Sequence, residues 1–179
     1  MNIVRHFAYG IGIFVLVVGF ALIQGGALEG EYLSAMGNAF GSMASGFRPD
    51  FGAFARAPLL IQVHAGAALS AVAIGLVQLF APKGTVPHRT LGYSWAILML
   101  VTAFTAVFIR EANNGNFSFI HIFVPLTLMG LFGVISNARK METAKHRNAV
   151  FSLFIGALIV PGLFAFMPGR LMWQMFFGG

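Results

Sequence analysis

Apolar stretches of nearly membrane length alternate with short polar turns along most of the chain. A transmembrane helix needs about 20 consecutive, mainly apolar residues, so the pattern predicts five such helices. Their predicted ranges are 8–24, 59–81, 88–109, 118–138 and 148–167. We therefore expect an all-α, polytopic membrane protein, a single integral membrane domain spanning 1–179, whose last four helices form a four-helix core.

The first apolar stretch is longer than the hydrophobic region of a signal peptide, and no small-residue cleavage site follows it closely. We expect it to be a retained helix. The connection that follows, residues 25–58, is long for a simple loop and rich in glycine and alanine. Two interpretations stay open for this outer loop: short helices on the membrane surface, or a loop that caps the bundle.

The composition supports a membrane protein, because 58% of the residues are hydrophobic and only 9% are charged. A soluble domain carries about 25% charged residues. The net charge of +6 comes from basic residues in short turns, which is typical of topology determinants and anionic-lipid contacts, so no nucleic acid partner is expected. The absence of cysteine excludes disulfides, thiolate metal sites and covalently attached c-type haem.

Lysine and arginine counts predict the orientation. With the N-terminus inside, seven basic residues fall on the inner side and four on the outer side. Basic residues are enriched in cytoplasmic turns, so the N-terminus is predicted inside and the C-terminus outside. We expect a multi-pass protein of the bacterial inner (cytoplasmic) membrane, in contact with the lipid bilayer.

Four histidines recur at the ends of the predicted core helices. His64 and His121 open the second and fourth helices near the outer face, and His88 and His146 open the third and fifth near the inner face. The spacings are similar: 88 − 64 = 24 and 146 − 121 = 25. If alternate helices lie diagonally in the bundle, the core offers one histidine pair near each face.

Two imidazoles facing each other across a bundle core are suited to axial ligation of haem iron. The two pairs would be separate sites, because roughly 24 Å of helix lies between the two levels. Arg89 and Arg147 directly follow the inner histidines and are candidates for pairing with haem propionates. Small residues that could flank a macrocycle are Gly66, Ala67, Ala68, Gly75, Gly92, Gly130 and Gly133. The alternative is that the histidines are polar anchors and the small residues only allow close helix packing.

Several stretches resemble a known family. The segment His88-Arg89-Thr90-Leu91-Gly92-Tyr93 and the late Pro168-Gly169-Arg170, together with His64, His121 and His146-Arg147, resemble bacterial membrane proteins of domain-of-unknown-function family 2306. That family implies no activity. The histidine placement also resembles the ascorbate-type two-haem transmembrane cytochromes b. That resemblance implies an outer haem on His64 and His121 and an inner haem on His88 and His146, although the histidines of those cytochromes lie deeper and farther apart in sequence.

The sequence thus favours a cytochrome b-like protein that transfers electrons across or within the bilayer through one or two b-type haems. It assigns no catalytic side chain and leaves open whether the chain is an oxidoreductase or an electron carrier. The candidate partners are a quinol, a soluble reductant and another membrane subunit. The alternative is a haem-free accessory subunit or small transporter whose histidines are structural or proton-responsive. A zinc hydrolase is disfavoured, because it needs three protein ligands and a base close together.

Overall fold

The computed structural model describes residues 48–110, 117–167 and 170–177, together with four isolated positions, 34, 37, 38 and 41. The predicted first helix and most of the outer loop lie outside these residues. The chain divides into two compact units, Leu59–Ile159 and the remainder, Met1–Pro58 with Val160–Gly179. Each unit is described by itself, and the single domain expected from the sequence stays a prediction.

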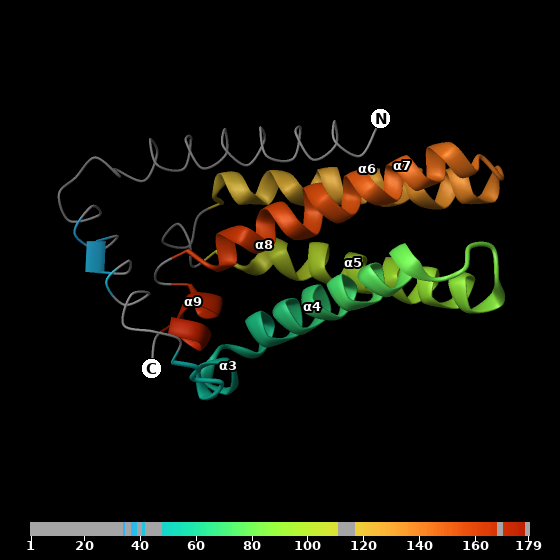
Figure 1. The fold of residues 1–179 in the computed structure, drawn as a ribbon. Coiled ribbons are helices and arrows are strands. Elements are labelled where there is room, and N and C mark those ends of the chain that lie inside the picture. Colours follow the sequence, from blue (N-terminus) through green and yellow to red (C-terminus); the bar gives the residue numbers. More distant parts are fainter. Residues whose placement is uncertain are drawn as a thin grey trace. The chain divides into compact units, whose positions relative to one another are not determined.

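The unit of Leu59–Ile159 is built from helices (Figure 1). It contains α4 (Leu59–Phe80), α5 (Val86–Phe108), the 3₁₀ turn η2 (Phe119–Ile122), α6 (Phe123–Arg139), α7 (Thr143–Leu153) and the π-helical segment η3 (Phe154–Ile159). The part of the chain that the structure describes contains no strand. It has four helices long and apolar enough to cross a membrane: Leu59–Phe80, Val86–Phe108, Ile120–Arg139 and Thr143–Ala165. The all-α, polytopic membrane fold is therefore confirmed.

The turn between α4 and α5 explains where α4 ends and where α5 begins. The Lys83 ammonium donates to the carbonyls of Gln78, Leu79 and Ala81, which α4 leaves without helical partners. Gly84 follows with a φ of 77°, a conformation that glycine adopts without steric cost. Thr85 then caps α5 by accepting a hydrogen bond from the main-chain N–H of His88.

The turn between α6 and α7 is shorter than the sequence predicts. Only residues 140–142 separate the helices, and Met141 takes a positive φ of 58°. The helix begins at Thr143, five residues before the predicted start at 148, and the main-chain N–H of His146 bonds the Glu142 carbonyl at 2.8 Å. The basic run was assigned to a turn from its charge, but lysine and arginine are good helix formers. His146 therefore lies in the first turn of a helix.

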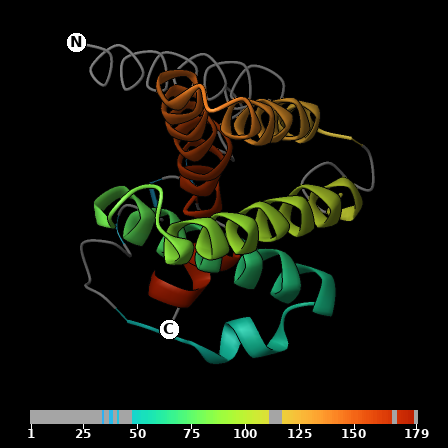
Figure 2. The ribbon, with the colours of Figure 1, turned by 90° about the vertical axis from the view of Figure 1, so that its right-hand side faces the viewer.

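The helices of this unit pack in chain order around a ring. The main contacts join α4 to α5, α5 to α6, α6 to α7, and η3 back to α4. Both turns, residues 81–85 and 140–142, lie at one end of the unit, which we call the turn end (Figures 1 and 2). This order places α4 diagonally from α6, and α5 diagonally from α7. The buried core consists of Ala71, Trp95, Ala96, Met99, Leu131, Val134, Leu153, Phe154 and Leu158.

The other unit contains α3 (Gly52–Arg56), α8 (Val160–Ala165) and α9 (Leu171–Phe177). Two main-chain hydrogen bonds join the segment before α3 to α9, from Arg48 to Phe176 at 3.1 Å and from Asp50 to Met175 at 2.8 Å. The described part of the outer loop thus contains a short helix, and its position on a membrane surface stays a prediction.

Candidate histidine sites

His64 lies in the second turn of α4 and is held by the neighbouring helix α5. Its Nδ1 is 3.0 Å from the Thr102 carbonyl oxygen and 3.0 Å from Thr105 Oγ1. A carbonyl only accepts hydrogen bonds, so in a neutral imidazole Nδ1 must carry the hydrogen. The Thr105 hydroxyl can accept as well, because its own hydrogen goes to the Val101 carbonyl at 2.7 Å. His64 therefore presents the lone pair of Nε2.

His121 lies in η2, at the same end of the unit as His64. Its Nδ1 caps this turn through Ser118, with distances of 3.1 Å to the main-chain nitrogen and 3.0 Å to the carbonyl oxygen. The tautomer decides which of these two contacts is the hydrogen bond. Nε2 of His121 is buried and has no hydrogen-bond partner among the described residues. When Nδ1 donates to the carbonyl, Nε2 has a lone pair for a metal, and when Nδ1 accepts from the main-chain nitrogen, Nε2 is itself a donor.

His88 and His146 lie in the first turns of α5 and α7, at the turn end. They lie at the same end of diagonal helices, as the predicted pairing requires, and their sharing of a ligand stays a prediction. His146 Nδ1 donates to the Val134 carbonyl of α6 at 2.9 Å, which leaves its Nε2 with a lone pair. His88 differs, because its Nδ1 is buried without any partner in the described chain. The arginines that follow these histidines, Arg89 and Arg147, are both exposed.

The small residues of the bundle divide into two groups. A Cβ added at Gly75 would lie 2.4 Å from the Phe154 ring, and one added at Gly130 would lie 2.7 Å from Leu153. These two glycines therefore serve close helix packing. Gly66 and Gly133 have nothing within 4 Å of an added Cβ, so space for a bulky group exists beside them.

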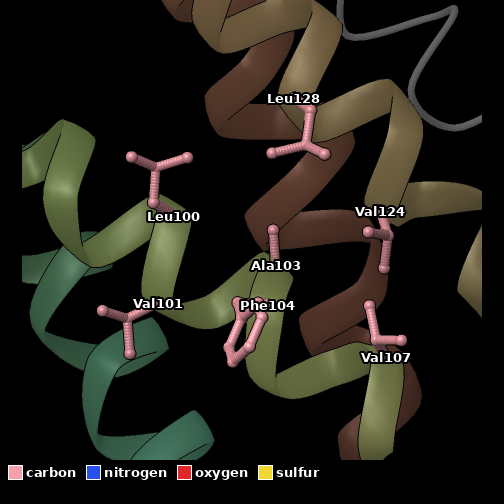
Figure 3. A pocket seen from close by; sticks show the side chains of 7 residues that line it. All are labelled: Leu100, Val101, Ala103, Phe104, Val107, Val124 and Leu128. Carbon is pink, nitrogen blue, oxygen red and sulfur yellow. The ribbon is translucent and has the colours of Figure 1, made fainter.

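An apolar cavity of about 420 Å³ lies between α5 and α6 (Figure 3). The side chains that line it are Leu100, Val101, Ala103, Phe104, Val107, Val124 and Leu128. None of them is an imidazole. The cavity is therefore not a preformed slot between the predicted ligands. Among the described residues, no group of three or more histidine and acidic side chains is placed to hold a metal ion.

Sequence reasoning missed four polar residues inside the apolar stretches. Thr102 and Thr105 orient His64, and the Gln78 side-chain amide donates to the His88 carbonyl at 3.1 Å. The fourth, Trp95, is buried with its Nε1 unpartnered. Polar groups are costly within a membrane span unless they have partners. Their presence in the apolar stretches could therefore have indicated that these side chains bond other helices.

The geometry of the histidines does not by itself identify a relative of this protein. No curated protein and no solved structure matches it significantly. A family model described as a predicted membrane protein of domain-of-unknown-function family 2306 matches residues 61–176, which include all four core histidines and the helices that carry them. This match covers more than half of the chain, and the protein therefore belongs to that family of predicted membrane proteins.

Proposed function

We propose that this protein is a membrane b-type haem protein that transfers electrons across or within the bilayer, with one haem held between His64 and His121. The observation that carries the proposal is the state of the two imidazoles. His64 Nδ1 donates to a carbonyl, which leaves its Nε2 with a lone pair, and Nε2 of His121 is buried without a partner among the described residues. The proposal requires the His121 tautomer in which Nδ1 donates to the Ser118 carbonyl, because only that tautomer leaves a lone pair on Nε2. Histidines that bind metals commonly donate their other ring N–H to a carbonyl, which fixes the tautomer and the ring orientation.

The donor set fits haem iron. His64 and His121 are carried by diagonal elements, α4 and the η2–α6 segment, and both lie at the end opposite the turns. The chain would supply orientation and an apolar surrounding, and the bound haem would supply one-electron chemistry.

The roles of the described residues follow from their contacts. Thr102 and Thr105 hold the His64 ring so that Nε2 keeps its lone pair, and Ser118 restrains the His121 ring. The bundle excludes water from Nε2 of His121, which is buried. As part of the same proposal, we place the protein in the bacterial inner membrane with its turn end inside, and expect a quinol or a soluble reductant as electron donor.

A haem-free membrane protein is the second candidate, and one observation favours it. The Nδ1 atoms of His64 and His146 each bond a carbonyl on the neighbouring helix, Thr102 on α5 and Val134 on α6. These bonds alone explain both histidines as connections between helices. An accessory subunit or small transporter would need nothing more from them.

The visible spectrum of the detergent-purified protein, expressed with ample haem, distinguishes the candidates. We expect a sharp reduced-minus-oxidised difference spectrum and release of non-covalent haem by pyridine extraction. His64→Ala and His121→Ala should remove the same spectral component, and the double variant should lose no more than either single one, because both ligands serve one site. His6→Ala is the matched control and should leave the spectrum unchanged. A colourless protein would refute the proposal and favour the haem-free candidate.

A further inference from the structure

Three of the four buried polar side-chain atoms that lack a partner in the described chain lie along one interface. They are Gln78 Oε1 on α4 and two atoms on α5, His88 Nδ1 and Trp95 Nε1. Buried polar atoms without partners cost roughly 1–3 kcal/mol each, so native proteins rarely leave them unsatisfied. Three on the same helix pair indicate that something absent from the polypeptide satisfies them.

The contacts around these atoms show that they form one cluster. The Gln78 amide nitrogen bonds the His88 carbonyl at 3.1 Å and lies 3.4 Å from the position of a Cβ added at Gly92. Trp95 Nε1 lies 3.2 Å from the corresponding Cβ position at Gly75, one helical turn from Gln78. His88, Gly92 and Trp95 are spaced by four and three residues, so they share one face of α5.

The π-helical segment η3 lies directly against this cluster. Phe154, its first residue, is buried and occupies the space left by Gly75. Insertions of π-helix into α-helices occur frequently at functional sites. The cluster and the irregular helix therefore coincide at the junction of α4, α5 and η3.

The hydrogen-bonding capacities define the missing partner. The Trp95 indole can only donate, the free oxygen of Gln78 can only accept, and His88 Nδ1 can do either. The set contains a donor-only atom and an acceptor-only atom, so a single partner for it must both accept and donate hydrogen bonds. The Phe154 ring and the Trp95 indole fill the space beside Gly75, which disfavours an organic ligand there, whereas a water molecule is small and both donates and accepts.

We propose that Gln78, His88 and Trp95 bind internal water, forming a hydrated path from the turn end into the bundle between α4 and α5. His88 is only half-buried and marks the entrance, and Trp95 lies roughly 10 Å deeper along α5. Buried waters typically make about three hydrogen bonds to otherwise unsatisfied polar groups, and each of these three atoms can supply one such bond to a chain of waters. The path gives water and its protons access to the bundle interior, and it does not depend on whether haem is bound.

Trp95 itself can report the water. Trp173→Phe leaves Trp95 as the one tryptophan of the chain. Ultraviolet resonance Raman spectra of this variant in detergent should show a hydrogen-bonded indole N–H that exchanges within minutes of transfer to D₂O. A non-bonded N–H would overturn the proposal. So would a bonded N–H that does not exchange, because its partner would then be a protein or lipid acceptor.

A second comparison tests the role of Gln78. In the Trp173→Phe background, Gln78→Met keeps the length of the side chain but removes its acceptor, so the indole hydrogen bond should weaken and its exchange should slow. Gln62→Met, near the other end of α4, is the matched control and should change neither. Equal effects of the two variants would refute the assignment. If Gln78→Met does not fold, the exchange measured on Trp173→Phe alone decides the proposal.

Discussion

Replacing Gly75 by alanine should destabilise the contact between α4 and η3. The added Cβ would lie 2.4 and 2.7 Å from two carbons of the Phe154 ring, closer than carbon atoms approach in proteins. Only 4% of Phe154 is exposed, so its ring cannot swing into solvent or lipid. Overpacking of this kind costs about 1–3 kcal/mol. Alanine offsets part of this cost, because it is favoured over glycine in a helix by up to about 1 kcal/mol.

Gly66→Ala supplies the matched control, because nothing lies within 4 Å of its added Cβ and it belongs to the same helix. Both substitutions gain the same helix propensity, so their difference isolates the packing cost of about 1–3 kcal/mol. That difference corresponds to roughly a 5- to 150-fold change in the unfolding equilibrium. Equilibrium unfolding in mixed detergent micelles with increasing dodecyl sulfate measures it.

The result that would refute the reasoning is a Gly75→Ala variant as stable as Gly66→Ala. A double variant gives an independent check. Phe154→Leu shortens the side chain that the new methyl group meets, so Gly75→Ala should cost less in that background than in the native one. Neighbouring residues that share a contact show such non-additivity, whereas additive effects would mean that the two side chains do not meet.

Three further predictions concern the rest of the chain. A reporter fused after Gly179 should be active only outside and one inserted near Lys83 only inside; the reverse pattern would invert the orientation. His88→Ala should spare the spectral component that depends on His64. Loss of that component in His88→Ala would mean that the haem does not lie at the end of the bundle opposite the turns. The pKa of Asp50 lies below its ordinary value because the Arg56 guanidinium donates a hydrogen bond to its carboxylate. The stability that this ion pair gives to α3 should therefore be present at neutral pH and lost as the pH falls through the lowered pKa. Protection factors of the α3 amides, obtained from hydrogen exchange relative to the intrinsic rate at each pH, measure this effect, and protection that stays unchanged in acid would contradict it.

The fold class could be predicted from the sequence because each element of the core repeats the same signal. Apolar stretches of about 20 residues separated by short turns leave few alternatives in a bilayer, where every main-chain group needs a partner. The end of α5 was also close to its prediction, at Phe108 rather than 109. The start of α7 was harder, because hydropathy cannot distinguish a basic turn from a basic first helical turn. A positive φ at Met141, which closes the turn in three residues, leaves no sequence signature of its own.

The candidate sites were predictable only in part. Spacing placed the histidines at alternating ends of successive helices, and the ring order of the helices has the diagonal arrangement that the pairing requires. Spacing says nothing about which ring nitrogen is engaged. That depends on which carbonyl or hydroxyl of another helix lies within 3 Å, as Thr102 and Thr105 do for His64. Likewise, Gly75 was expected to make room for a cofactor, but the room is taken by Phe154, which lies 79 residues away in the chain (154 − 75 = 79).

The two candidate functions use the same hydrogen bonds, so removing those bonds cannot separate them. His64 bonded to α5 and His146 bonded to α6 restrain the helices whether or not a metal binds, and loss of either bond is expected to loosen the bundle in both cases.

The two candidate functions differ at the other ring nitrogen, Nε2. A purely structural histidine gains nothing from a buried, unpartnered Nε2, which carries a desolvation cost of roughly 1–3 kcal/mol. His121 bears that cost, and ligation of a metal by Nε2 would offset it. For this reason the geometry favours the haem proposal at the end opposite the turns. At the turn end, the unpartnered atom is Nδ1 of His88, and Gln78 Oε1 and Trp95 Nε1 on the same helix pair also lack partners. Water can bond all of these atoms, so it explains this end without a metal.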